Sequence, residues 1–541
     1  MFGTDSSRLT AGLFLLSLLT LSAYVGVLGL GFVWDDRALV LENPLIQDLR
    51  MLPAYFGTDL WSTEADVVSS GYYRPLMLLS LAIDHALFGL EPAGYHLHSL
   101  LWHLLSIGSL SLLLRRLVSL KAALMGAALF ALHPIQSETV VWIAARNDSM
   151  AATFALLALW LVDEQRDGRW HLVGAGILSG LALLAKESVL LLPAALILLD
   201  WARCRPLGWR RYFAISSGLL AALMLRFISE VGGTALPTVD AVAMSAERAP
   251  HILALIGMMI GWPSVLSSAW SLEWLALSVP TLLGGLSFLA ALAVLPLVVS
   301  GERRRLAFSG LGIAVLFYLP AVVPIVSKGL VGERYLYLPM AGLVLWAVSM
   351  LPERRVWILS VLLPLCLLRI HTRVPDWTEE RELWTAAARD VPDPFTYTGL
   401  AHSLNNTDGD RDAALRLFMT SLADPLPYRG ACGTPITAAF YTRRPALAAQ
   451  IGWWSLHRGC PEDGDFVGRV AVALAAAGDW EEAERVLEAG QEDVSGRSTV
   501  AQAAIYLRAG DTVRYDQLRA AWAGATPLES QVKSLMQMED D

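Results

Sequence analysis

Two adjacent aspartates, Asp35 and Asp36, stand directly after the first apolar run that is long enough to cross a membrane, in the stretch FVWDDRALVLENP. A carboxylate placed where a helix leaves a bilayer can take a proton from a hydroxyl at the membrane surface. Such a base typically accelerates a transfer reaction by about 10²–10⁴-fold. The pair could also cap an interfacial helix or remain a solvated pair, so its role depends on the elements around it.

The composition is that of a polytopic membrane protein. Of the 541 residues, 55% are hydrophobic and 17% charged, and the mean hydropathy is +0.49. Residues 376–541 hold 15 Lys and Arg against 26 Asp and Glu, whereas the remainder holds 26 against 24. We therefore predict a membrane domain over residues 1–375 and an extracytoplasmic domain over 376–541. The acidic second domain argues against nucleic-acid binding, which needs a basic surface.

About twelve apolar runs approach the roughly 20 residues that a membrane-spanning helix needs. They lie near 11–32, 95–114, 118–134, 148–163, 170–186, 188–202, 212–228, 250–267, 279–300, 307–326, 338–351 and 356–371. No clear small-residue cleavage site follows the first run, which predicts an uncleaved anchor.

Basic connectors between spans should face the cytoplasm. Twelve crossings would put Arg303-Arg304-Arg305 outside, so one run must fail to cross. We expect this to be 250–267, which contains Trp262-Pro263. The prediction is eleven spans in the inner (cytoplasmic) membrane, with a cytoplasmic N-terminus and a periplasmic or extracytoplasmic C-terminal domain.

This topology gathers the unusual polar segments on the outer face. They are the Asp35-Asp36 loop, YYRPL (72–76), HPIQSETVVWIAARND (133–148), AKES (185–188) and SKGLVGERYLYLP (327–339). Ionisable residues at span ends are costly unless they have a task or a partner. Their concentration on one side predicts an active site at the outer leaflet.

The second domain shows a recurring polar turn followed by a helix start. The intervals between successive turns are 34, 35 and 32 residues, with turns beginning at Gly409, Arg443, Gly478 and Gly510. A period near 34 is typical of tetratricopeptide repeats, so we predict a tetratricopeptide-like α-solenoid with a concave face for a partner. Cys432 and Cys460 fall on neighbouring helices, and both a disulfide and two separate thiols are compatible with that placement.

The ordered motifs FVWDDRALVLENP, YYRPLMLLSLAIDHALFGLEPAGYHLHSLLWHLL, ALHPIQSETVVWIAARND, LLAKESVLLLP and GERYLYLP, with the repeat tail, resemble a known family. It is that of the transmembrane and tetratricopeptide-containing O-mannosyltransferases and their bacterial relatives. The resemblance covers most of residues 25–400. The tail is shorter than in the animal members, and its repeats are more degenerate.

The resemblance implies an all-α GT-C fold and transfer of a sugar, mannose in the family, from a polyprenyl phosphate to an acceptor hydroxyl outside the cytoplasm. The acceptor implied is Ser or Thr of a protein, recruited by the repeat domain, and the reaction is expected to invert the anomeric carbon. Membrane lipid is the remaining partner.

The leaving group of such a reaction is a phosphate, so one base and several cations suffice without a general acid. Asp35 matches the first acidic position of the related families' acidic motif and is the predicted base, which Asp36 would orient or assist by binding the acceptor. The predicted ligands of the donor phosphate are Arg74, Arg146, Lys186 and Arg334. The predicted sugar and acceptor pocket consists of His133, Glu138, Asp148, Glu187 and Tyr335.

Simpler interpretations stand beside these. Arg74 could anchor the chain at the interface, Arg334 could pair with Glu333, and Lys186-Glu187 could form a salt-bridged turn. His133 precedes a proline and could simply end a helix.

Two further alternatives concern the 133–148 loop. Glu138 and Arg146 are eight residues apart and would share a face if the loop were helical. Trp34 and Trp142 could stack on a sugar, or belong to the aromatic belt at the membrane interface.

We expect neither a metal nor a cofactor, although a carboxylate pair could hold Mg or Mn. Two other protein classes compete with the enzyme. A transporter would need charges at the midplane or on both faces, and a non-catalytic membrane-anchored repeat scaffold would not need the acidic pair. Within the enzyme class, the alternative acceptor is a glycan or a lipid.

Overall fold

The computed structural model describes residues 2–61, 71–163, 168–229, 231, 237–261, 263–405, 410–422, 436, 439, 444–457, 464–489, 497–521 and 528–537. The chain forms two compact units, Met1–Leu383 and Trp384–Asp541. The sequence placed the division slightly earlier, between residues 375 and 376. Cys432, Cys460 and the turn start at Gly409 lie outside the described residues, as does Arg443.

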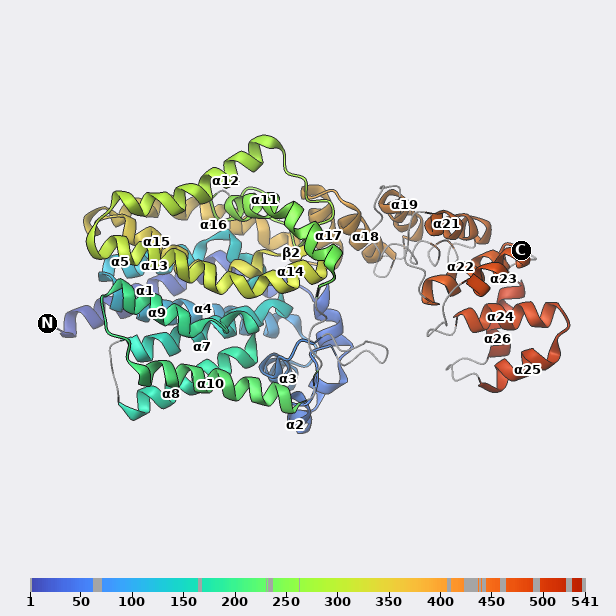
Figure 1. The fold of residues 1–541 in the computed structure, drawn as a ribbon, viewed down its shortest axis with the longest axis horizontal. Helices are drawn as coiled ribbons and strands as arrows, with labels where there is room; N and C mark the ends of the chain where they lie inside the picture. Colours follow the sequence, from blue (N-terminus) through green and yellow to red (C-terminus); the bar gives the residue numbers. More distant parts are fainter. Residues whose placement is uncertain are drawn as a thin grey trace. The chain divides into compact units, whose positions relative to one another are not determined.

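The first unit is a bundle of helices (Figure 1). Its helices are α1 (Phe2–Tyr24), α2 (Leu52–Tyr55), α3 (Pro75–Phe88), α4 (Pro92–Leu117), α5 (Leu120–Leu132), α6 (Ser137–Val141), α7 (Arg146–Asp163), α8 (Arg169–Ala185), α9 (Leu192–Ala202), α10 (Trp209–Ile228), α11 (Val239–Gly261), α12 (Val279–Val294), α13 (Gly301–Tyr318), α14 (Val322–Lys328), α15 (Pro339–Met350) and α16 (Leu363–Arg373). Two antiparallel strands, β1 (Trp270–Ser271) and β2 (Leu330–Val331), pair Trp270 with Val331 and Ser271 with Leu330. The prediction of an all-α chain is confirmed in the described residues, whose sheet is confined to these two short strands.

Six helical stretches among the described residues are long and apolar enough to cross a membrane. They are Ser7–Gly29, Pro92–Leu117, Trp209–Ile228, Val279–Val298, Gly301–Lys328 and Glu353–Trp377. Five other expected spans form helices of 11 to 18 residues, namely α5, α7, α8, α9 and α15. The chain is therefore a multi-pass membrane protein, and the count of eleven spans stays a prediction.

Close helix packing in this unit depends on small residues. Gly310 of α13 faces Gly342 of α15, and a Cβ added at Gly310 would lie 2.6 Å from the Gly342 carbonyl oxygen. Such a crossing lets two backbones approach closely, which is a common source of helix association in lipid. On the other side of the bundle, α4, α7, α8 and α10 pack in succession (Figure 1).

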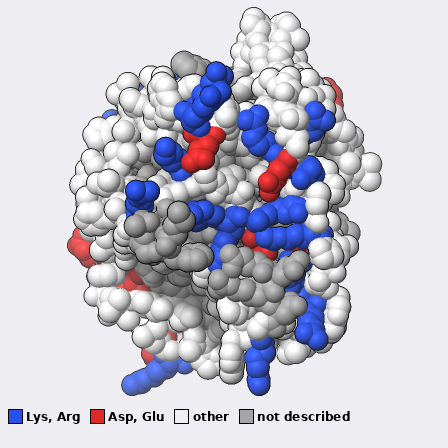
Figure 2. Space-filling view, turned by 90° about the vertical axis from the view of Figure 1, so that its left-hand side faces the viewer, with Lys and Arg blue, Asp and Glu red and all other residues white. Residues whose placement is uncertain are grey.

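Basic residues gather at one end of the first unit (Figure 2). Arg115 and Arg116 lie in the last turn of α4, and Arg303 to Arg305 lie in the first turns of α13. At the opposite end of α4, the imidazole Nε2 of His96 lies 3.2 Å from the carbonyl oxygen of Gly31, a few residues before the aspartate pair. Because α4 has 26 residues, its two ends lie about 39 Å apart. The arginines and the acidic loop thus occupy opposite ends of the bundle.

The second unit is made of short helices. They are α18 (Pro394–Ser403), α19 (Arg411–Leu422), α21 (Pro445–His457), α22 (Gly464–Ala476), α23 (Trp480–Ala489), α24 (Arg497–Arg508), α25 (Thr512–Ala521) and α26 (Leu528–Gln537), while α17 (Glu380–Asp390) crosses the division between the units.

Two of the expected polar turns are visible in that unit. Gly478 and Gly510 adopt φ +85° and +76°, a conformation that favours glycine at the end of a helix. The Asp479 and Asp511 carboxylates then accept backbone N–H groups of the next helix, at 3.4 and 3.1 Å. The turns act as predicted, and the assignment to tetratricopeptide repeats stays a prediction.

Candidate active site

The aspartate pair lies in a loop whose backbone is held at several points. The chain leaves the first span at Gly29, and the N–H of Gly31 donates to the Thr378 carbonyl at 2.9 Å. Trp34 adopts φ +51°, which is uncommon for a residue with a side chain. Its ring stacks on Trp142 with centroids 4.8 Å apart and planes 11° apart. Trp142 is only 3% exposed, so the two tryptophans pair with one another and do not form an aromatic belt facing lipid.

Asp36 fastens this loop to the start of α7. Its fully buried carboxylate accepts the N–H of Ala144 at 2.8 Å and that of Val33 at 3.3 Å. Burial raises the pKa of Asp36 to about 8, although both backbone N–H groups act to lower it. A carboxyl that is enclosed in this way positions its neighbour and does not face a substrate. We therefore treat Asp36 as a positioning residue.

Asp35 is the more accessible member of the pair. Its side chain is half-buried, and its carboxylate makes no hydrogen bond to a described residue. Burial raises the pKa of Asp35 to about 6, against the lowering effect of the nearby Arg334 guanidinium. A carboxylate with a free lone pair and a pKa slightly below neutral is suited to general-base catalysis at neutral pH.

Arg334 lies on the short 3-10 helix Glu333–Leu336 that links β2 to α15. Its backbone N–H donates to Glu138 Oε2 at 2.8 Å, and its guanidinium Nη1 donates to Glu138 Oε1. The guanidinium carbon lies 4.9 Å above the Trp142 ring and 4.9 Å above the Tyr335 ring. The sequence left open a pair between Arg334 and Glu333, but the partner is Glu138. Because one edge of the guanidinium faces Glu138, the other edge is available to an anion.

Two more cations complete the polar cluster. Arg74, which precedes the first turn of α3, binds Glu187 through Nη2 at 2.6 Å and Nε at 3.2 Å. Lys186, at the end of α8, donates to Asp148 Oδ2 at 2.6 Å. Lys186 and Glu187 therefore do not pair with each other, contrary to the salt-bridged turn considered above.

The two carboxylates and two cations influence one another electrostatically. Burial alone would raise the pKa of Glu187, but the Arg74 guanidinium outweighs it and lowers the pKa to about 2. Burial lowers the pKa of Lys186 in spite of Asp148. Arg74, Lys186 and Arg334 all act on the Asp148 carboxylate, so the three cations converge on one region.

A small pocket opens at this convergence. Its lining includes Asp148, Lys186, Glu187 and Tyr335. Immediately beside it, an apolar groove of about 440 Å³ runs between α11, α13 and α15, and Pro339 lines both. The pocket wall carries one cation, Lys186, and two carboxylates, Asp148 and Glu187, and the neighbouring groove offers a hydrocarbon surface.

Two of the residues predicted for the site lie outside this cluster. Arg146 is completely buried, where it pairs with Asp84 and donates to Ser80 Oγ at 2.9 Å and to Ser99 Oγ at 3.0 Å. All of its contacts hold α3, α4 and α7 together, so we leave it out of the phosphate site. The ring Nε2 of His133 lies 3.0 Å from the Ile260 carbonyl oxygen, in a separate pocket.

Glu138 and Arg146 do not lie on one continuous helix, so the condition for a common face is not met. α6 ends at Val141, and Trp142 is extended with ψ 117°. The helical register is therefore broken between the two residues. Asp148, in contrast, lies one half-turn beyond Arg146 on α7 and reaches the cluster.

The described residues contain no group of three or more His, Cys, Asp or Glu side chains placed to hold a metal ion. In the described part of the chain the cluster combines the Asp35 carboxylate, three cations with their paired carboxylates and a neighbouring hydrocarbon groove.

Residues 74–229 match the family model "Dolichyl-phosphate-mannose-protein mannosyltransferase". This segment contains Arg74, Glu138, Asp148 and Lys186. The Protein O-mannosyl-transferase Tmtc1 of Drosophila melanogaster is 34% identical over 160 residues, which is 29% of this chain and 19% of that protein. The Protein O-mannosyl-transferase F38B6.6 of Caenorhabditis elegans is 24% identical over 76% of this chain and 63% of that protein.

These matches confirm the predicted resemblance: the chain is similar to the transmembrane O-mannosyltransferases over part of its length. It matches about a fifth of the length of the Drosophila relative and less than two thirds of the nematode one. A solved structure, the crystal structure of ArnT from Cupriavidus metallidurans bound to undecaprenyl phosphate, is similar with a TM-score of 0.37 and 16% identity over 82% of this chain and 80% of that one. A likeness at that TM-score does not bear on the fold or the site.

Proposed function

We propose that the membrane unit is a glycosyltransferase. It transfers a sugar, mannose in the first instance, from a polyprenyl-phosphate carrier to an acceptor hydroxyl, with Ser or Thr of a protein as the preferred acceptor. The observation that carries this proposal is the half-buried Asp35 carboxylate, which accepts no hydrogen bond from the described residues and is under the electrostatic influence of the Arg334 guanidinium. The matches to protein O-mannosyltransferases support the sugar and the acceptor.

In the proposed reaction the acceptor oxygen attacks the anomeric carbon while the bond from that carbon to the phosphate oxygen breaks. The hydroxyl proton passes to the Asp35 carboxylate, and the carrier leaves as polyprenyl phosphate. Arg334, Arg74 and Lys186 would stabilise the charge that builds up on the phosphate, where each charge-assisted hydrogen bond contributes about 1.5–3 kcal/mol. A single displacement of this kind inverts the anomeric configuration.

The apolar groove supports a lipid-linked donor. Its lining is almost wholly hydrocarbon, including Leu253, Leu289, Leu311 and Leu343. It borders the pocket that contains Lys186, so a chain bound in the groove would have its phosphate beside that lysine. A soluble nucleotide sugar would gain nothing from that border, because it carries no hydrocarbon chain to bury.

We further propose that the site faces away from the cytoplasm. The arginines at the far end of α4 and at the start of α13 favour a cytoplasmic placement for that end (Figure 2). The acidic loop, about 39 Å away along α4, then lies at the outer leaflet. The N-terminus of α1 is accordingly cytoplasmic, and the second unit follows the last span on the outside.

The test is reconstitution of the full chain in liposomes with radiolabelled polyprenyl-phosphate-mannose and a Ser/Thr-rich acceptor peptide. Label should appear in the peptide, and Asp35→Asn should abolish its appearance. Label in a lipid or glycan fraction alone would favour the alternative acceptor. Donor binding without any transfer would instead favour the scaffold or the transporter.

A further inference from the structure

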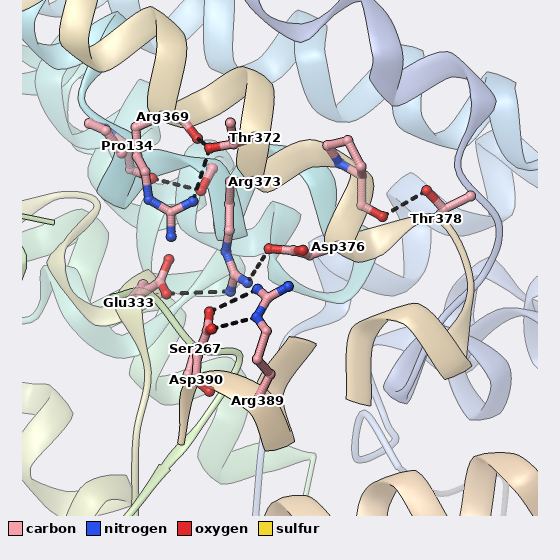
Figure 3. A network of polar contacts seen from close by, with 12 residues as sticks. Pro134, Ser267, Glu333, Arg369, Thr372, Arg373, Asp376, Thr378, Arg389 and Asp390 are labelled. Atoms are coloured by element: carbon pink, nitrogen blue, oxygen red, sulfur yellow. Dashed lines mark hydrogen bonds and ion pairs between the residues drawn. The ribbon is translucent and has the colours of Figure 1, made fainter. Parts of the chain in front are cut away.

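A network of ion pairs around Arg373 supports one side of the border between the pocket and the groove (Figure 3). Arg373 is the last residue of α16, and its side chain is buried. Its Nη1 donates to Asp376 Oδ2 at 3.1 Å, and its Nη2 lies 3.5 Å from Glu333 Oε1. Glu333 begins the 3-10 helix Glu333–Leu336, so Arg373 holds the start of a helix whose next residues line both cavities.

The border itself is made of two stretches of chain. In the first, Tyr335 lines the pocket, Leu336 lines the groove, and Pro339 lines both. In the second, Phe317 lines the pocket and Tyr318, the last residue of α13, lines the groove. Tyr318 therefore lies at the level of the pocket along α13, on the side of the groove.

Tyr318 brings a polar group to an otherwise apolar surface. Among the described residues, only two polar side chains line the groove, those of Tyr318 and of Ser245 in α11. Both end in a buried hydroxyl that has no hydrogen-bond partner in the described part of the chain. Buried hydroxyls in native proteins nearly always have a partner, so these two groups indicate that a polar atom of a ligand enters the groove. Tyr318 is the one that lies at the border with the pocket.

Tyr318 is linked to the cations of the site through Tyr335. The Tyr318 hydroxyl interacts electrostatically with that of Tyr335. The Lys186 ammonium lies 5.5 Å from the centre of the Tyr335 ring, and the Arg334 guanidinium carbon lies 4.9 Å from the same centre. The unpartnered hydroxyl thus belongs to the region in which the cations of the site meet the hydrocarbon groove.

We propose that the Tyr318 hydroxyl donates a hydrogen bond to the phosphate of a polyprenyl-phosphate lipid whose chain lies in the groove. This inference rests on the proposed function, because it takes the lipid donor as the occupant of the groove. The phosphate would have the Lys186 ammonium on the pocket side and the Tyr318 hydroxyl on the groove side. Because the hydroxyl is already buried, the lipid does not have to strip water from it, and the new bond to a charged group contributes strongly to affinity.

The inference predicts that one substitution has different effects on folding and on binding. Tyr318→Phe keeps the ring in the groove and removes only the hydroxyl. In the ligand-free protein the change removes a buried polar group without a partner, so the unfolding temperature should stay unchanged or rise. In the complex it removes a hydrogen bond to a phosphate, so the affinity for the lipid should fall. A hydroxyl with a purely structural role would show the reverse.

The experiment measures dissociation constants of the purified full chain in detergent. The two probes are farnesyl phosphate, a short polyprenyl phosphate, and farnesol, which lacks the phosphate. For Tyr318→Phe we expect the Kd of farnesyl phosphate to rise about 10- to 100-fold and that of farnesol to stay within about twofold. The matched control is Tyr24→Phe, which should bind both probes as the wild type does. The Tyr24 hydroxyl is also buried without a partner among the described residues, but it lines neither the pocket nor the groove.

An unchanged Kd for farnesyl phosphate in Tyr318→Phe overturns the inference. An equal rise for both probes overturns it as well, because the hydroxyl would then not recognise the phosphate. A lower unfolding temperature of ligand-free Tyr318→Phe would show a structural partner and have the same consequence. Farnesyl phosphate binding needs neither a sugar nor an acceptor, so the two proposals fail separately. Binding that depends on Tyr318 without any transfer overturns only the transfer reaction, whereas transfer with unchanged binding by Tyr318→Phe overturns only the role of Tyr318.

Discussion

Asp35→Asn removes the proposed base and leaves the surrounding charges in place. Because the Asp35 carboxylate makes no hydrogen bond to a described residue, the amide should fit without loss of a structural contact. We expect kcat to fall by about 10²–10⁴-fold. This corresponds to about 2.7–5.4 kcal/mol of lost transition-state stabilisation.

The pH dependence gives a second measure of the same group. With a pKa of about 6, about nine tenths of Asp35 is ionised at pH 7 and about a tenth at pH 5. Since the ionised form is the active base, kcat/KM of the wild type should fall about tenfold from pH 7 to pH 5. Removal of Arg334, which lowers the pKa of Asp35, should move this acid limb to higher pH.

The matched control is Asp36→Asn. With a pKa of about 8, Asp36 is mostly neutral at pH 7, so the amide reproduces its charge and its size. Its carbonyl oxygen can still accept the N–H of Ala144, and the contact with Val33 is the one at risk. We expect a loss within about tenfold, equivalent to about 1.4 kcal/mol.

The assay is transfer of radiolabel from polyprenyl-phosphate-mannose to peptide in liposomes, with folding checked by thermal unfolding in detergent. A rate for Asp35→Asn close to that of the wild type would refute Asp35 as the base. Asp35 would also be refuted as the base if the two variants were equally stable to heat and Asp36→Asn lost more of its transfer rate than Asp35→Asn did. A pH profile without an acid limb near 6 would show that another group controls the rate.

The remaining predictions concern stability, recognition and orientation. Arg146→Gln should destabilise the membrane unit by about 3–5 kcal/mol, because it leaves the buried Asp84 carboxylate with His98 as its remaining ionisable partner among the described residues; an unchanged unfolding temperature in detergent would contradict this. Asp148→Asn should raise the donor KM, because Lys186 loses the carboxylate that holds it in position and the three cations lose the charge on which they converge. A fully active variant would show that Asp148 does not belong to the site. Trp142→Leu should cost more free energy of activation, calculated from kcat, than free energy of unfolding. Equal costs in both would reduce the role of Trp142 to packing. In a variant with its other cysteines replaced, exposed Cys204 should react with a membrane-impermeant maleimide in intact cells only after permeabilisation; labelling without permeabilisation would reverse the proposed orientation.

The parts of the fold that follow from local composition could be predicted from the sequence. The apolar runs became helices, and the Gly-Asp turns at Gly478 and Gly510 took the conformation that such turns need. The number of crossings stays a prediction. Several runs form helices shorter than a bilayer is thick, and hydropathy alone does not show whether such a helix spans or packs inside.

For the site, the sequence brought the right motifs together but not the right pairs. The partners of Arg334, Lys186 and Glu187 come from distant segments, whereas the alternatives considered from sequence were their chain neighbours. Arg146 and Asp148 share one motif, yet residues two apart on a helix point to different sides. One therefore holds the core, and the other reaches the cluster.

The network around Arg373 was missed entirely. Arg373 lies beyond the last motif, in a segment that the sequence treats as the junction between the domains. The signal that could have found it is the unusual run RVPDW at residues 373–377, which places an arginine, an aspartate and a tryptophan directly after an apolar helix. No alternation or spacing in that run indicates contact with residue 333.

The positive φ of Trp34 has a consequence for the conditions under which the loop keeps its shape. A non-glycine residue in this conformation costs about 1–2 kcal/mol, which is similar to the roughly 0.5–1.5 kcal/mol that its stacked aromatic pair contributes beyond burial. These two terms nearly cancel, so the order of the loop depends on its other contacts, among them those of Asp36 and the bond from Gly31 to Thr378. The pKa of Asp36 is raised from 3.8 to about 8, so the stability that its neutral form contributes is complete at low pH and is lost as the pH rises through about 8. The two neighbouring aspartates would then set the lower and upper pH limits of activity. Asp35 is ionised, as a base must be, only above about pH 6, and Asp36 is protonated, as the loop requires, only below about pH 8.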